Sequence, residues 1–147
     1  MPDILHKVRV VTPDRGATYQ ALTTCEGLSG WWTTDTTGDN DVGGVVKFRF
    51  GGGGFDMEVL ELEPGERVRW LVVDGPSEWI GTRIDWRLKH DDAGTVVLFK
   101  HEDWKEPVEF MHHCSTKWAM FLMSLKSLVE TGRGQPFPED VKVDDAH

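Results

Sequence analysis

The sequence predicts one α+β domain in which a curved antiparallel sheet of six strands wraps around a long C-terminal helix, with two short helices after the first strand. Three observations carry this prediction. Short segments of alternating apolar and polar residues, separated by glycine and proline turns, occupy the middle of the chain. An apolar stripe at three- and four-residue spacing then runs from Met111 to Leu128. Seven tryptophans supply large apolar rings to an expected concave wall.

The N-terminal part contains one strand and two short helices. Ile4 to Val11 is rich in β-branched residues and predicts the first strand. A helix is expected over Pro13 to Leu22. The Thr12 hydroxyl suits its N-cap, and proline is tolerated at the first helical position. A second short helix is expected over Cys25 to Trp32. The polar, turn-rich stretch from Thr33 to Asn40 is expected to be a loop.

Five further strands form a meander in the middle of the chain, and each is joined to the next by a short turn. They are expected at Val45–Phe50, Phe55–Val59, Arg67–Val73, Ile80–Leu88 and Thr95–His101. The glycines at 51–54 form a hairpin; a phosphate-binding loop would require a helix to follow, and a strand follows instead.

The last element is a helix that starts near Pro107 and ends at Gly132. About 25 residues at a rise of 1.5 Å give roughly 37 Å, enough to cross the whole sheet. Residues 1–136 are expected to form a single domain, and the acidic residues 137–147 a mobile tail.

Composition excludes several classes of function. With 16 Lys and Arg against 25 Asp and Glu, the net charge is −9, which disfavours nucleic acid and anionic lipid as partners. No segment is long and apolar enough for a membrane span, and no signal peptide is evident at the N-terminus. Two cysteines in different elements do not indicate a disulfide framework, so a cytoplasmic location is expected.

The concave wall is a candidate binding site for a small molecule. A strongly curved sheet and a straight helix are not expected to touch everywhere, and bulky rings rarely fill such a surface without a gap. For any single residue the alternative is ordinary core packing. The predicted ligand contacts are Phe48, Met57, Trp70, Ile84, Trp86, Phe99, His101, Cys114, Trp118 and Leu122.

Groups that could do chemistry each have a simpler interpretation. His101 shares a strand face with Phe99, so it could hydrogen-bond a ligand or act as a base at the cavity rim, or simply bond a neighbouring group. His112, His113 and Cys114 are adjacent on a helix and point about 100° apart, so they cannot converge on one metal ion. Cys114 is expected to be a buried apolar residue rather than a nucleophile. We therefore expect no metal, no cofactor and no catalytic residue.

Several segments carry a resemblance to a known family. They are the residues Ala21–Leu28 leading into Trp31 and Trp32, then Trp79–Thr82, Thr95–Trp104, Trp118–Lys126 and Glu130–Pro136. The chain resembles the START-like (SRPBCC, helix-grip) superfamily, and within it the small proteins similar to the C-terminal domain of the activator of the ninety-kilodalton heat-shock protein ATPase. The resemblance implies a cavity for an apolar or amphipathic small molecule between the sheet and the long helix. The superfamily hosts lipid carriers, hormone sensors, cyclases and chaperone cofactors on one frame, so it specifies the fold better than the function.

The leading hypothesis is non-catalytic binding of a hydrophobic or amphipathic small molecule or lipid by a monomer or homodimer. A second hypothesis, from the resemblance alone, is a chaperone as partner, in an ATPase-activator-like or stress-response role. A third is an enzyme of the cyclase or dehydratase type that uses His101, which would need a second polar group across the cavity.

Overall fold

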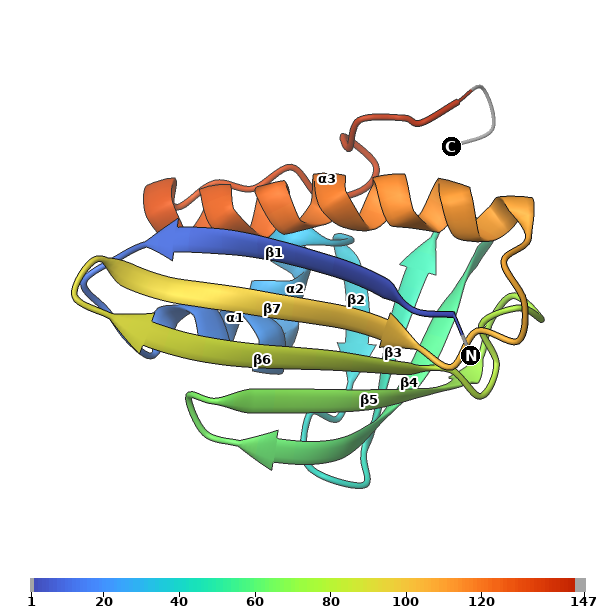
Figure 1. The fold of residues 1–147 in the computed structure, drawn as a ribbon, viewed down its shortest axis with the longest axis horizontal. Coiled ribbons are helices and arrows are strands. Elements are labelled where there is room, and N and C mark those ends of the chain that lie inside the picture. Colours follow the sequence, from blue (N-terminus) through green and yellow to red (C-terminus); the bar gives the residue numbers. More distant parts are fainter. Residues whose placement is uncertain (1, 145–147) are drawn as a thin grey trace.

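The computed structural model describes residues 2–144, which form one curved antiparallel sheet and three helices (Figure 1). The sheet order is β1-β7-β6-β5-β4-β3-β2, so the first and last strands of the sequence are neighbours. In Figure 1 the long helix α3 extends along the sheet, and α1 and α2 lie on the inner side of its curve. The elements are β1 (Ile4–Val11), α1 (Ala17–Thr23), α2 (Cys25–Trp31), β2 (Asp35–Gly38), β3 (Val45–Phe50), β4 (Gly53–Glu63), β5 (Arg67–Asp74), β6 (Arg83–Asp91), β7 (Gly94–Glu102) and α3 (Glu109–Thr131).

The predicted fold class is confirmed, but the sheet has seven strands rather than six. The additional strand, β2, lies in the stretch that the sequence predicts to be a loop, and it pairs with β3 from Asp35↔Arg49 to Gly38↔Val46. Its polar composition reflects its position at the edge of the sheet, where most side chains meet water. Thr36 is the buried member of the strand.

Several element boundaries differ from the prediction, and at the first helix local side-chain bonds form turns instead. The first helix begins at Ala17 rather than Pro13: Thr12 Oγ1 accepts from the Asp14 backbone N–H, and Asp14 Oδ1 accepts from that of Gly16. These bonds favour turns over a continued helix. Ile80, predicted within a strand, is 45% exposed in the turn before β6.

Helix α3 covers the free edge of β1. The Lys126 ammonium donates to the Arg9 carbonyl at 2.5 Å, and the Glu130 carboxylate accepts from the Val11 N–H at 2.7 Å. Unpaired backbone groups on an edge strand are a template for pairing with another chain. Here side chains of α3 satisfy two of them and fix the helix against the sheet.

Aromatic rings fill the space beneath the middle of α3. Trp118 projects from the helix, and its ring centroid lies 4.5 Å from that of Phe99 and 5.0 Å from that of Trp32. Trp32 in turn stacks on Trp70 with an angle of 6° between the ring planes. The expected hollow therefore does not extend along the whole helix, because indoles from opposite walls meet in its middle.

The chain after α3 returns to the body of the protein. Gln135 N donates to Ser124 Oγ at 2.7 Å, and Phe137 N donates to the Trp32 carbonyl at 2.8 Å. The expected mobility of the acidic tail stays a prediction: its residues 145–147 lie outside the described residues, and Asp140 contacts α3 through an ion pair with Lys117.

Gly27 provides a test of the contact between the two short helices. A Cβ at this position would lie 2.5 Å from the Cα of Ala21. Because the clash is with backbone atoms, relieving it requires a shift of one helix relative to the other, which costs free energy. We expect Gly27→Ala to lower the free energy of unfolding by about 1–3 kcal/mol, as for overpacking in a core. Urea denaturation measures the change. Gly52→Ala is the matched control, because a Cβ there meets nothing within 4 Å; equal stability of the two variants would contradict the assigned close approach.

Candidate functional site

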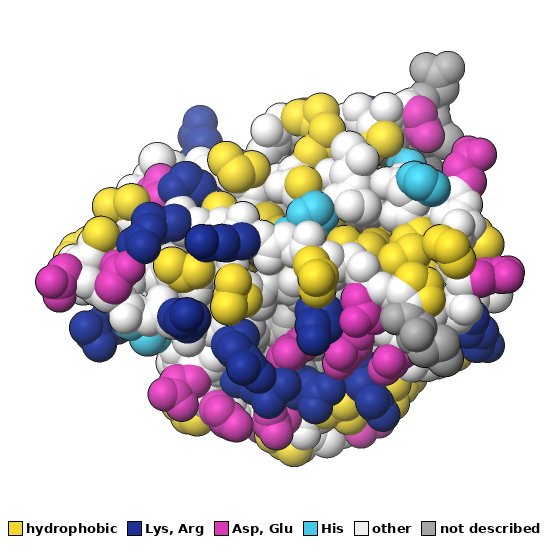
Figure 2. All heavy atoms as spheres, viewed as in Figure 1, with side chains coloured by type: hydrophobic (Ala, Val, Ile, Leu, Met, Phe, Trp, Pro, Cys, Tyr) yellow, Lys and Arg dark blue, Asp and Glu magenta, His cyan; other side chains and the backbone are white. Residues whose placement is uncertain are grey.

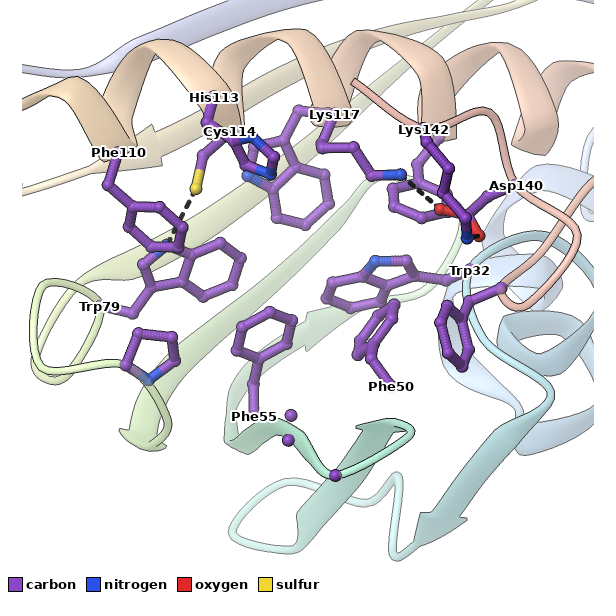
Figure 3. Close-up of a pocket in the computed structure, with 17 residues that line it drawn as sticks. Trp32, Phe50, Phe55, Trp79, Phe110, His113, Cys114, Lys117, Asp140 and Lys142 are labelled. Carbon is purple, nitrogen blue, oxygen red and sulfur yellow. Dashed lines mark hydrogen bonds and ion pairs between the residues drawn. The ribbon is translucent and has the colours of Figure 1, made fainter. Parts of the chain in front are cut away.

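A cavity of about 420 Å³ lies at one end of the aromatic core. It is bounded by the N-terminal half of α3, the β3–β4 hairpin, the loop that precedes β6 and the chain that follows α3 (Figure 3). Its apolar wall consists of Trp32, Phe50, Phe55, Pro76, Trp79, Phe110, Trp118, Phe121 and Phe137.

The wall is held by ring contacts between different elements. Phe55 of β4 stacks on Trp79 at 4.0 Å with an angle of 11° between planes, and Trp79 is 5.9 Å from Trp118 of α3. Phe50 contacts Phe137 at 5.4 Å. Loop, hairpin, helix and C-terminal segment therefore share one continuous aromatic surface, which is suited to an apolar molecule.

Glycines form the floor at the β3–β4 hairpin. Gly52, Gly53 and Gly54 line the cavity, and a Cβ at either of the first two would meet no atom within 4 Å. A Cβ at Gly54, in contrast, would lie 1.9 Å from the Phe48 carbonyl oxygen, so glycine is required there for the strands to approach. The hairpin thus leaves this side of the cavity open.

The polar part of the lining is small and lies mostly at one end. Lys117, Asp140 and Lys142 form an ion-paired group, and Figure 3 shows Asp140 and Lys142 at the opposite end of the cavity from Phe110 and Trp79. His113 and Cys114 of α3 also line the cavity.

Two of the ten predicted ligand contacts, Cys114 and Trp118, line this cavity. The other eight are buried in the core and are absent from its lining: Phe48, Met57, Trp70, Ile84, Trp86, Phe99, His101 and Leu122. The sequence pattern identified the correct faces of the strands and the helix, but rings from facing elements contact one another over most of that surface.

His101 is sealed within a chain of hydrogen bonds. The Trp118 indole N–H donates to His101 Nδ1 at 3.1 Å, so the proton of the neutral ring must be on Nε2. Nε2–H then donates to Thr82 Oγ1 at 2.8 Å, and the Thr82 hydroxyl donates to the Trp79 carbonyl at 2.5 Å. Both ring nitrogens are occupied and the side chain is fully buried, which leaves no lone pair for a substrate.

Burial lowers the pKa of His101 from 6.5 to about 3. Because no counter-charge replaces water around the ring, the neutral form is strongly favoured near neutral pH. His101 is therefore a structural residue that joins β7 to α3, and the geometry does not support its predicted place at a cavity rim.

Cys114 is similarly unsuited to chemistry. Its Sγ accepts from the Trp79 indole N–H at 3.3 Å. Burial raises the pKa of the thiol to about 12, and the Trp79 bond offsets only part of this effect. A thiol with so high a pKa is almost entirely protonated at neutral pH, and the protonated form is a weak nucleophile. Among residues 2–144, no group of three or more His, Cys, Asp or Glu side chains is placed to hold a metal ion.

The lining residues that were not predicted from the sequence come from several segments: Trp32 after α2, the β3–β4 hairpin (Phe50, Gly52, Gly53, Gly54 and Phe55), the loop before β6 (Pro76 and Trp79), the flank of α3 and the C-terminal segment. Phe110, His113, Lys117 and Phe121 follow one another at three- and four-residue steps along the flank of the apolar stripe of α3. That spacing was visible in the sequence. Phe137 is the one Phe, Trp or Tyr in the C-terminal acidic stretch, and an isolated apolar ring in such a stretch indicates packing against the domain. The proximity of Asp140 to Lys117, in contrast, depends on the fold and has no signal in the sequence.

Comparison with known proteins identifies the family. The model of the family described as activator of Hsp90 ATPase homolog 1-like protein matches residues 14–130, which is most of the chain. The chain belongs to this family. The resemblance found in the sequence is thereby confirmed. A search of curated proteins gave no significant match.

Solved structures agree with this membership in the activator family. The Aha1 dimer from Colwellia psychrerythraea has a TM-score of 0.84 and 43% identity, over 91% of this chain and 100% of that one. Protein SSP2350 from Staphylococcus saprophyticus has a TM-score of 0.75 and 21% identity, over 90% and 95%. CalU16 from Micromonospora echinospora has a TM-score of 0.73 and 19% identity, over 92% and 69%. The last two, at low identity, support the fold alone.

The buried state of His101 gives a testable pH dependence. Between pH 6.5 and about 3, the unfolded chain binds a proton at this residue that the folded chain does not. Its contribution to stability is therefore complete above about pH 6.5 and declines as the pH falls, by up to about 1.4 kcal/mol per unit.

We expect the pH profile of stability to be steeper in the unmodified protein than in His101→Gln, which can keep both hydrogen bonds but does not titrate. Urea denaturation from about pH 7 to pH 4 measures both profiles. Parallel profiles would show that His101 takes up a proton in the folded state. Nitrogen NMR should additionally find the proton on Nε2.

Proposed function

We propose that this protein binds a hydrophobic or amphipathic small molecule, without transforming it, in the cavity beneath the N-terminal half of α3. The observation that carries the proposal is an open, aromatic-lined space of about 420 Å³. Ligand sites in proteins span roughly 300–1,000 Å³ and combine an apolar wall with a few polar groups. This cavity has both features, and its contents would be a compact molecule rather than a long lipid chain lying under the whole helix.

The chemistry of the lining favours binding over catalysis. The Cys114 thiol stays protonated, and the carboxylate of Asp140 is held by two lysines. His101, the base of the cyclase or dehydratase hypothesis, is behind the wall with both nitrogens bonded. Positioned acid and base groups are needed for proton transfer, and the residues that line this cavity offer no such free pair.

Both Cys25 and Cys114 are free thiols, which supports the cytoplasm as the location.

A second candidate is modulation of a chaperone ATPase, which family membership and the 43% identity to an Aha1 protein favour. It would use the outer surface of the sheet, where basic and acidic side chains are interspersed with apolar ones (Figure 2). Among them, Arg67 pairs with Asp85 at 3.0 Å and Arg69 with Glu102 at 2.9 Å. The ATPase rate of the purified chaperone, measured with saturating protein, decides this candidate; an unchanged rate rejects it.

The Colwellia relative is a dimer, which favours a homodimer for this chain as well, and sedimentation would test it.

Blocking the cavity mouth tests the proposed binding. The neutral fluorescent probe N-phenyl-1-naphthylamine should bind with increased emission. We expect His113→Trp to weaken this binding by about fivefold or more, because the indole would occupy space at the mouth and displace roughly one ring of buried probe surface. Fluorescence titration measures the affinity, and circular dichroism checks the fold.

The control is His112→Trp, which places the same indole on the exposed side of the same helix turn. Its probe affinity should equal that of the unmodified protein. Absence of probe binding to the unmodified protein, or equal losses in both variants, would refute the cavity as a ligand site.

A further inference from the structure

The charged groups of the cavity carry a net charge opposite to that of the chain. The lining includes two ammonium groups, of Lys117 and Lys142, and one carboxylate, of Asp140. At this end of the cavity the three charges of Lys117, Lys142 and Asp140 sum to +1 (two positive, one negative), whereas the chain as a whole has −9. A local excess of positive charge in an acidic protein indicates attraction of a negative group to this end of the cavity.

Lys117 is the less exposed of the two cations. Its side chain is 14% exposed, its ammonium pairs with Asp140 Oδ2, and it donates to the Val141 carbonyl at 2.9 Å. The same ammonium lies 4.8 Å from the centroid of the Phe121 ring, part of the apolar wall. The charge is therefore placed where the aromatic surface ends, as required for binding the head of an amphipathic molecule whose body lies on the rings.

Lys142 approaches from the opposite side of the same carboxylate. Its ammonium donates to Asp140 Oδ1 at 2.6 Å and to the Pro138 carbonyl at 3.3 Å. With a side chain 44% exposed, it borders solvent. The two lysines thus bracket the two oxygens of one carboxylate, one from the helix and one from the C-terminal segment.

Asp140 occupies the position that an anionic head group would need. Its side chain is 6% exposed. Burial opposes its ionisation, but the bonds to Lys117 and Lys142 outweigh this effect, so its pKa lies below the ordinary value and it is a carboxylate. It is carried by the segment after Phe137, which is neither sheet nor helix, so its replacement would leave the sheet and α3 intact.

We propose that the preferred ligand is an amphiphile with one anionic head group of the carboxylate type, which binds between Lys117 and Lys142 in place of the Asp140 carboxylate while its apolar body lies on the aromatic wall. This inference rests on the proposed binding function and specifies its ligand class. Asp140 acts as an internal competitor: it satisfies both lysines in the free protein and is exchanged for the ligand's own charge. The free-energy cost of displacing Asp140 is reduced because the ligand's carboxylate takes its place beside the two lysines.

The test compares three probes of equal chain length, decanoate, decan-1-ol and decyltrimethylammonium, by titration calorimetry below their micelle concentrations at about pH 8, where decanoate is ionised. We expect Lys117→Met, which keeps the apolar stem but removes the charge, to weaken decanoate binding by about tenfold and decanol binding by less than about twofold. Asp140→Asn should tighten decanoate binding by about threefold or more, and weaken binding of the cationic probe.

Lys89→Met is the matched control, because Lys89 is exposed on β6 and does not line the cavity; it should leave all three affinities unchanged. If Lys117→Met does not fold by circular dichroism, Lys142→Met replaces it. In the unmodified protein, decanoate affinity should also decrease from low to high salt while decanol affinity does not.

The outcomes separate this inference from the function on which it rests. If decanol and decanoate bind but respond equally to the variants and to salt, the cavity binds apolar molecules and the head-group preference is refuted; the lysine–aspartate group then only fastens the C-terminal segment. If none of the three probes binds, the binding function itself fails, and the ligand class with it.

Discussion

The structure depends on the packing of Trp118 between the sheet and the N-terminal helices. Trp118 lies in the middle of α3 and contacts an aromatic ring of β6, one of β7, and the ring of Trp32 at the end of α2. Its indole N–H donates to His101 and so fixes the orientation of that ring. Aromatic pairs of this geometry each contribute about 0.5–1.5 kcal/mol beyond the apolar area they bury. Because α3 is thereby held at a fixed height over the sheet, the same contact determines where the helix and the sheet diverge.

The cavity is a consequence of that divergence. Under the middle of α3, Trp32, Trp70 and Trp118 bring the two walls into contact. Toward the start of the helix the opposing wall is the β3–β4 hairpin, where glycines replace side chains that could otherwise extend inward. Packing density in cores is high, so a space persists only where the chain offers too little volume to fill it. A glycine floor beneath an aromatic wall is such a place.

The sequence predicted the parts of the fold that depend on local pattern. The period-two segments, the stripe of α3 and the C-terminal stop at Gly132 are each set by residues near in sequence. Strand β2 was missed because an edge strand needs only one buried residue, here Thr36, and so lacks alternation. In the candidate site, Cys114 and Trp118 followed from the helix stripe, but the Lys117–Asp140 pair joins residues 23 positions apart across a turn. No local pattern encodes such a contact.

Burial divides the polar groups of this protein into two kinds. His101, Thr82 and the Trp118 N–H satisfy one another within the core, and a polar network completed in this way gives rigidity and leaves nothing for an outside molecule. Lys117 and Asp140 also satisfy one another, but across the boundary between α3 and a segment that lies outside the sheet and helices. A ligand cannot compete for the first set without unfolding the core, whereas it can compete for the second by displacing one side chain. Selectivity is therefore expected to depend on the C-terminal segment, although most of the wall belongs to the sheet and helices.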